Sequence, residues 1–91
     1  MNNIVSRQKE SLHEILFNKI NNYLHSVDTK TLTNLQGMYL AEIEPPLLEA
    51  TLEKTRFNQV QTAKMLGISR GTLRKKLTHY FGDKYCTTRE D

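Results

Sequence analysis

The segment from Asn58 to Tyr80, NQVQTAKMLGISRGTLRKKLTHY, constrains the fold of this 91-residue chain more than any other feature. It holds two short helical patterns separated by Gly67, and glycine ends a helix readily because it reaches positive φ without strain. Ala63 is small enough for two helices to cross closely, and the apolar Ile68 is expected between them. This spacing predicts a helix-turn-helix.

Polar residues that favour helix starts define both helices of this motif. Asn58 is expected to cap a first helix over residues 59–66, and Ser69 a second helix whose first turn is Arg-Gly-Thr. The second helix has an inner apolar stripe and an opposite polar and basic face. The stripe comprises Leu73, Leu77 and Tyr80, and the opposite face comprises Gly71, Arg74, Lys75 and Thr78.

The positive charge of the chain is concentrated around the motif. Residues 54–82 contain seven Lys and Arg side chains and no Asp or Glu, whereas residues 1–53 contain four basic and seven acidic side chains. The net charge of only +3 therefore conceals a strongly polarised molecule. A positive pole that coincides with a helix-turn-helix is typical of a protein that binds double-stranded DNA. The alternative is a helical interaction module whose basic end binds an acidic protein partner.

The second motif helix offers residues for two kinds of DNA contact. The first turn of such a helix enters the major groove, where arginine commonly binds guanine O6 and N7, so Arg70 is the candidate for reading a base. Phosphate contacts position a protein without reading sequence. The residues expected to make them are Thr72, Arg74, Lys75 and Lys76.

The first half of the chain predicts two more helices after a flexible polar arm over residues 1–10. Ser11 and Glu14 have the spacing of a capping box, and a single apolar stripe at helical spacing follows. The stripe comprises Leu12, Ile15, Leu16, Ile20, Tyr23, Leu24 and Val27. A polar connection over residues 26–34 leads to a longer helical pattern over residues 35–55.

This longer pattern is apolar on two faces, and such a helix needs more than one neighbour. One face comprises Leu35, Met38, Tyr39, Ile43, Leu47, Ala50 and Thr51, and the other comprises Leu40, Leu48 and Leu52. We therefore expect a homodimer. Its expected interface comprises Leu12, Ile15, Leu16, Tyr23, Leu35, Tyr39, Ile43 and Leu47. The alternative is that the motif helices cover the second face.

Two consecutive prolines, Pro45 and Pro46, lie inside the longer pattern. Each removes a backbone N–H, so the helix must either kink or break. The apolar spacing keeps its phase across the prolines, which favours a kink, and a split at Glu44 is the competing interpretation.

The composition of the chain bears on its oligomeric state, its cellular compartment and the kinds of site that it can contain. With 37% apolar residues and no Trp, a single domain has little core to bury, which also favours oligomerisation. The lone Cys86 cannot form an internal disulfide, and no stretch has the length of a membrane span or signal, so we expect a cytoplasmic protein. The histidines lack partners at metal-ligand spacing, and no nucleophile–base pair or phosphate loop occurs. We expect no enzyme, no metal site, no cofactor and no small-molecule ligand.

At these residues the sequence resembles the Fis (factor for inversion stimulation) family of bacterial nucleoid-associated DNA-binding proteins. Gly67-Ile68 and the run RGTLRKKL over residues 70–77 match the motif of that family, and LAE over 40–42 with PLL over 46–48 resembles its long dimerisation helix. The similarity extends over residues 12–82 without gaps. A related motif ends NtrC-type transcriptional activators, so the motif alone is less specific than the longer match.

The resemblance implies an all-α, intertwined homodimer with a helical dimerisation region over residues 11–55, a helix-turn-helix over residues 56–82 and a polar tail over 83–91. Such a dimer bends DNA, at a cost of about 1–6 kcal/mol, and acts as an architectural factor and transcription regulator of the nucleoid. By motif position, Ser69 and Arg70 contact bases. The expected backbone contacts are Asn58, Gln59, Thr72, Arg74, Lys75 and Lys76.

Several positions depart from the family pattern. Ser69 stands where the family usually has Asn, so looser discrimination between bases is expected. Thr78 and His79 replace a Lys-Lys pair, and Val60 and Gln61 replace a common Thr and Arg, which predicts weaker contacts to flanking DNA. The arm before residue 12 is too short for the β-hairpin that touches recombinase, so stimulation of DNA inversion is not expected.

Overall fold

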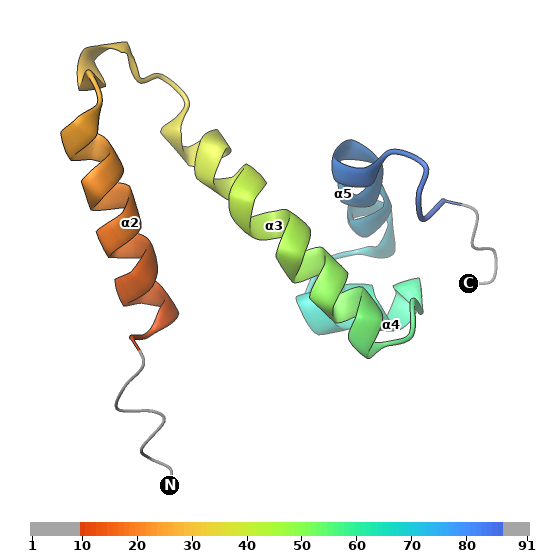
Figure 1. Ribbon diagram of the computed structural model, residues 1–91. Coiled ribbons are helices and arrows are strands. Elements are labelled where there is room, and N and C mark those ends of the chain that lie inside the picture. The colour runs from red at the N-terminus through yellow and green to blue at the C-terminus, as the bar shows by residue number, and fades with distance from the viewer. Residues whose placement is uncertain (1–9, 87–91) are drawn as a thin grey trace, which may run out of the picture. The chain divides into compact units, whose positions relative to one another are not determined.

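A computed structural model describes residues 10–86. These residues form two compact units, divided between residues 34 and 35. All regular secondary structure within residues 10–86 is helical, which confirms the predicted all-α class (Figure 1). Most of the predicted N-terminal arm, residues 1–9, and the end of the predicted tail, residues 87–91, lie outside the described residues.

The first unit contains helix α2, Leu12–Ser26, and a 3-10 turn, Thr29–Thr31. The predicted capping box is confirmed: the Glu14 backbone N–H donates to Ser11 Oγ at 3.1 Å, and the Ser11 N–H donates to Glu14 Oε1 at 3.0 Å. No residue of α2 is buried, and Leu12 and Phe17 are 67% and 59% exposed. Of the predicted apolar stripe, Leu12 and Ile15 are exposed and the other five residues are half-buried, so the stripe is only partly covered within this unit.

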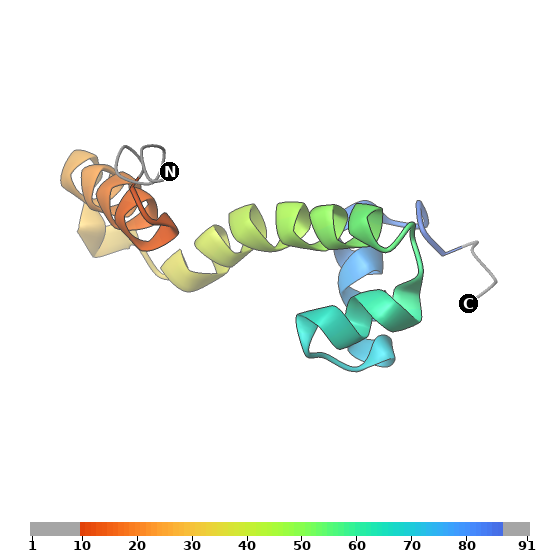
Figure 2. The same cartoon turned by 90° about the horizontal axis from the view of Figure 1, so that it is seen from below.

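The second unit contains α3, Leu35–Lys54, α4, Gln59–Leu66, and α5, Arg70–Phe81. Helix α3 runs through Pro45 and Pro46 as one element, and Figure 2 shows its ribbon without a break. The structure therefore decides against a split at Glu44. The apolar phase that the sequence keeps across the prolines belongs to one helix.

The core of the second unit lies where α3, α4 and α5 meet. Its buried side chains are Leu48 and Leu52 from α3, Ala63 from α4, and Leu73 and Leu77 from α5. The motif helices thus cover the Leu48 and Leu52 face of α3, which was the alternative to a partner chain on that face. The expectation of a dimer now depends on apolar residues that stay outside this core.

A tight turn between α3 and α4 sets the direction of α4. Arg56 and Phe57 both have positive φ, 60° and 67°, although neither is glycine. The Phe57 N–H donates to the Leu52 carbonyl oxygen at 2.7 Å. Below the turn, the hydroxyls of Thr55 and the fully buried Thr62 are hydrogen-bonded at 2.7 Å. This pair ties the start of α4 to the end of α3.

Candidate nucleic-acid interface

The turn between α4 and α5 has the predicted geometry. Asn58 Oδ1 accepts from the Gln61 N–H at 3.0 Å, which caps the start of α4. Gly67 ends the helix with φ of 79°, and the N–H groups of Gly67 and Ile68 both donate to the Ala63 carbonyl oxygen, at 2.9 and 3.0 Å. The two hydrogen bonds to one carbonyl oxygen are possible because glycine adopts the left-handed conformation.

The start of α5 is capped by Ser69, as predicted. Ser69 Oγ accepts from the Thr72 backbone N–H at 3.0 Å and donates to Thr72 Oγ1 at 3.0 Å. Ser69 thereby uses its one hydroxyl proton within the helix start, and Thr72 keeps its own proton for another acceptor. The cap and a phosphate contact by Thr72 are therefore compatible.

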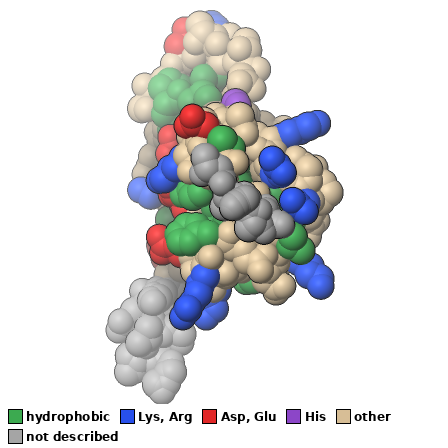
Figure 3. Space-filling view, turned by 90° about the vertical axis from the view of Figure 1, so that its right-hand side faces the viewer, with side chains coloured by type: hydrophobic (Ala, Val, Ile, Leu, Met, Phe, Trp, Pro, Cys, Tyr) green, Lys and Arg blue, Asp and Glu red, His purple; other side chains and the backbone are tan. Residues whose placement is uncertain are grey.

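A basic surface extends along the outer side of α5. Arg70, Arg74 and Lys75 are exposed, and Arg74 and Lys75 line an open depression together with Thr78 and His79. Figure 3 shows several Lys and Arg side chains standing out along the right edge of the visible face. The geometry offers several cations at one helix, suited to a polyanion.

Lys76, the fourth expected phosphate contact, lies differently. Its Nζ is 3.0 Å from Glu44 Oε2 on α3, and the other carboxylate oxygen, Oε1, accepts from the Tyr80 hydroxyl at 2.6 Å. The hydrogen bond from Tyr80 and then that from Lys76 lower the pKa of the Glu44 carboxyl below its ordinary value. The same bond to Glu44 raises the pKa of Tyr80. Lys76 thus contacts another helix of its own chain.

Gln59, expected at the DNA backbone, is a buried residue with only 5% of its surface exposed. Its Nε2 donates to the Tyr85 carbonyl oxygen at 3.1 Å, so the amide points into the protein. The N–H groups in the first turn of a helix have no partner within the helix, so a phosphate contact by Gln59 would have to use its backbone N–H. The role of Gln59 in binding stays a prediction, and its side chain has a structural one.

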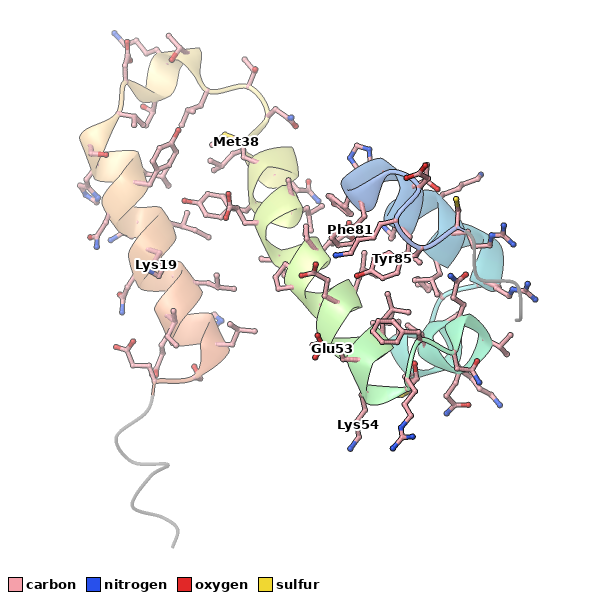
Figure 4. All side chains as sticks on the ribbon, turned by 45° about the vertical axis from the view of Figure 1, so that its right-hand side comes forward. Lys19, Met38, Glu53, Lys54, Phe81 and Tyr85 are labelled. Atoms are coloured by element: carbon pink, nitrogen blue, oxygen red, sulfur yellow. The ribbon has the colours of Figure 1, made fainter. Side chains whose placement is uncertain are left out.

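The start of the predicted polar tail packs against the motif. The rings of Tyr85 and Phe81 meet edge to face with their centroids 5.4 Å apart, and Figure 4 shows them side by side next to α3. The Phe57 ring stacks on Tyr85 at 6.3 Å, and Lys84 Nζ lies 5.3 Å from the centre of the Tyr85 ring. Residues 83–86 therefore contribute to this unit.

Sequence reasoning missed the roles of Glu44 and Tyr85. The sequence pattern predicts no contact for Glu44, and it predicts only a polar tail for residues 83–91. One signal was present for the tail: Tyr85 is its only aromatic residue, at i+4 from Phe81. For Glu44 no local signal exists, because its two partners are 32 and 36 residues away.

Within residues 10–86, no helix combines the length and the apolarity that crossing a membrane requires.

Comparisons with known proteins agree with this geometry. Residues 39–80 match the model of a family described as "Bacterial regulatory protein, Fis family". A DNA-binding protein Fis from Glaesserella parasuis is 46% identical over 69 residues, which are 76% of this chain and 70% of that protein. Proteins of the same name from Vibrio cholerae and Histophilus somni are 48% identical over 61 residues, which are 67% of this chain and 62% of theirs. The chain therefore belongs to the Fis family of bacterial regulatory proteins.

Proposed function

We propose that this chain is a DNA-binding and DNA-bending protein that acts as a homodimer, as an architectural factor and transcription regulator at the bacterial nucleoid. The observation that carries the proposal is the exposed basic surface of α5, which begins at a capped helix start directly after a tight turn. The absence of acidic residues from residues 54–82 leaves this surface strongly positive. The names of the relatives support the same function.

The proposed contacts follow from the position of each residue on α5. Arg70 reads a base from the first turn, with Ser69 beside it, and Thr72, Arg74 and Lys75 bind phosphates. At the start of α4, the Asn58 side chain and the backbone N–H of Gln59 add a second phosphate contact, because a helix N-terminus attracts anions.

The uncovered apolar residues of the chain support the homodimer. Helix α2 has 15 residues and none is buried, and helices of that length are marginal in water without a packing partner. In the second unit, Leu47 remains 51% exposed although the neighbouring Leu48 is in the core. A second copy of the chain is the partner that we propose for these residues.

The experiment that tests the function is a binding selection on random duplexes, with the stoichiometry measured on the selected sites. We expect symmetric sites that bind two chains, and a linear fall of log affinity with log salt whose slope is about −0.9 per phosphate contacted. Equal binding to polyglutamate and to duplex DNA, with no selected site, would favour the acidic-protein alternative.

The proposed division between a base contact by Arg70 and a phosphate contact by Lys75 gives a first prediction. Arg70→Ala should cost about 1–3 kcal/mol on a selected site and flatten the preference between sites. Lys75→Ala should weaken binding to all duplexes alike and reduce the salt slope by about 1.8, because each of the two bound chains loses one phosphate contact. Fluorescence anisotropy on a selected and a scrambled duplex measures both, and identical behaviour of the two variants would contradict the division.

A further inference from the structure

We propose that Glu44 is a positioning residue of the interface, which fixes α5 on α3 through Lys76 and Tyr80 and makes Lys76 a structural residue instead of a phosphate contact. The inference rests on the proposed DNA binding for its effect on affinity, but the contact itself can be tested without DNA.

The geometry of the three side chains carries the proposal. Glu44 uses one carboxylate oxygen for Lys76 Nζ, at 3.0 Å, and the other for the Tyr80 hydroxyl, at 2.6 Å. Lys76 and Tyr80 are four residues apart, so they lie one above the other on the same side of α5. A carboxylate that holds two successive turns restricts both the rotation of α5 about its axis and its slide along α3.

The environment of the group favours a lasting contact over a fluctuating surface pair. The side chains of Lys76 and Glu44 are 33% and 24% exposed, so both charges are partly shielded from water. A charge-assisted hydrogen bond of this kind is stronger than a neutral one. To reach a phosphate, Lys76 would have to leave the carboxylate unpaired beside a half-buried tyrosine. The neighbouring Lys75 is exposed and faces no such cost.

Because of the position of Glu44, the proposal and simple electrostatics predict opposite effects on DNA binding when its charge is removed. Glu44 lines one surface hollow together with Thr72, Lys75 and His79, so a negative charge lies directly beside the proposed phosphate contacts. Simple Coulomb repulsion predicts that removal of this charge strengthens DNA binding. A positioning role predicts the opposite for selected sites, because α5 would present Arg70 and Thr72 in the wrong orientation.

The central experiment compares Glu44→Gln with Glu42→Gln, which removes the same charge from an exposed position of the same helix. We expect Glu44→Gln to reduce the preference for a selected over a scrambled duplex by about three- to thirtyfold, the range of mutations that act through packed neighbours. Glu42→Gln should leave that preference unchanged. Tighter binding of Glu44→Gln to all duplexes with an unchanged preference would overturn the proposal.

The role of Lys76 is tested by the salt slope. Lys76→Ala should leave the slope of log affinity against log salt unchanged, whereas Lys75→Ala should reduce it by about 1.8, which is about 0.9 for each of the two chains. Equal reductions in the two variants would return Lys76 to the phosphate contacts and overturn this part of the proposal.

A measurement on the free protein separates this inference from the proposed function. The hydrogen bond to Glu44 raises the pKa of the Tyr80 phenol, and NMR of the tyrosine ring carbons at alkaline pH reports that ionisation. We expect Glu44→Gln to lower the pKa of Tyr80, and Tyr80→Phe identifies the resonance and serves as a second, milder variant for binding. An unchanged Tyr80 titration would overturn the contact, whereas a shifted titration in a protein that does not bind DNA would refute only the proposed function.

Discussion

Backbone strain is concentrated at Arg56 and Phe57, whose φ angles are 60° and 67°. Residues with a Cβ pay about 1–2 kcal/mol for the left-handed conformation, because the Cβ approaches the following carbonyl oxygen. Phe57 is half exposed, but its ring stacks on Tyr85 at 6.3 Å. The side chain thus compensates in part for the conformation of its own backbone, and the tail beyond α5 takes part in shaping the turn before α4.

An alanine variant is usually more stable than a glycine variant at the same position, and the strain at Phe57 reverses this order. Phe57→Ala and Phe57→Gly both remove the ring, but only glycine relieves the positive φ, so we expect Phe57→Gly to be more stable than Phe57→Ala by about 1 kcal/mol. Urea unfolding followed by circular dichroism measures the difference. At the exposed helical position Ala41, the matched control, Ala41→Gly should be destabilising by about 1 kcal/mol. An equal stability of the two Phe57 variants would contradict the strain.

Ser69 combines a cap with the proposed reading of bases, and its hydroxyl is already bonded to Thr72. Ser69→Ala should destabilise the protein by about 1 kcal/mol through loss of the cap. Ser69→Asn keeps a capping oxygen and extends a longer side chain, so it should retain stability and sharpen the discrimination between duplexes. Thermal unfolding and a competition assay with a single-base variant of a selected site test both effects. A loss of stability in Ser69→Asn would show that the cap needs the short hydroxyl.

At the scale of elements, the contact between α3 and α5 makes stability depend on pH. Tyr80 and Lys76 donate hydrogen bonds to Glu44, and the charges of Lys76 and His79 also favour its charged form, so its pKa in the folded protein lies below the ordinary 4.5. A lowered pKa stabilises the fold fully above the unfolded pKa and loses this effect as the pH falls through the folded pKa. The free energy of unfolding of Glu44→Gln should therefore lie below that of wild type by a constant amount from neutral pH to about 5, and this difference should shrink below about pH 4.5.

The measurement is the free energy of unfolding in urea for both proteins at a series of pH values. Glu42→Gln provides the control for a general change of charge, and it should show no such convergence with wild type. A deficit of Glu44→Gln that stays the same at acid pH would mean that the charge of Glu44 does not stabilise α5.

Elements that depend on neighbours in sequence were predictable, and contacts that depend on the fold were not. The capping box of Ser11, the cap of Asn58, the glycine end at Gly67 and the cap of Ser69 are confirmed because each involves bonds between residues three to five apart. The bonds of Glu44 span 32 and 36 residues and that of Gln59 spans 26. Helical periodicity carries no information about which polar residues such distances bring together.

At the scale of the whole molecule, an excess of positive charge and a partly exposed apolar stripe lie in different parts of the chain. The basic residues of 54–82 lack acidic neighbours in sequence, and the apolar stripe of α2 lacks any buried residue. A polyanion would neutralise the first, and a second copy of the chain would cover the second. Because covering the apolar stripe does not involve the basic surface, we expect the proposed dimer to form without DNA.

This requirement gives a prediction about α2. On a monomer, Ile15 would be an exposed position where a substitution changes stability by less than about 0.5 kcal/mol, whereas burial between two chains makes a charge there strongly unfavourable. Ile15→Asp should therefore dissociate the dimer and lower the thermal midpoint, and the midpoint of wild type should rise with protein concentration. Asn18→Asp adds the same charge to an exposed polar position of α2 and should leave both properties unchanged. Sedimentation equilibrium measures the oligomeric state, and a wild-type protein that sediments as one chain, with a midpoint independent of concentration, would contradict a dimer built on this stripe.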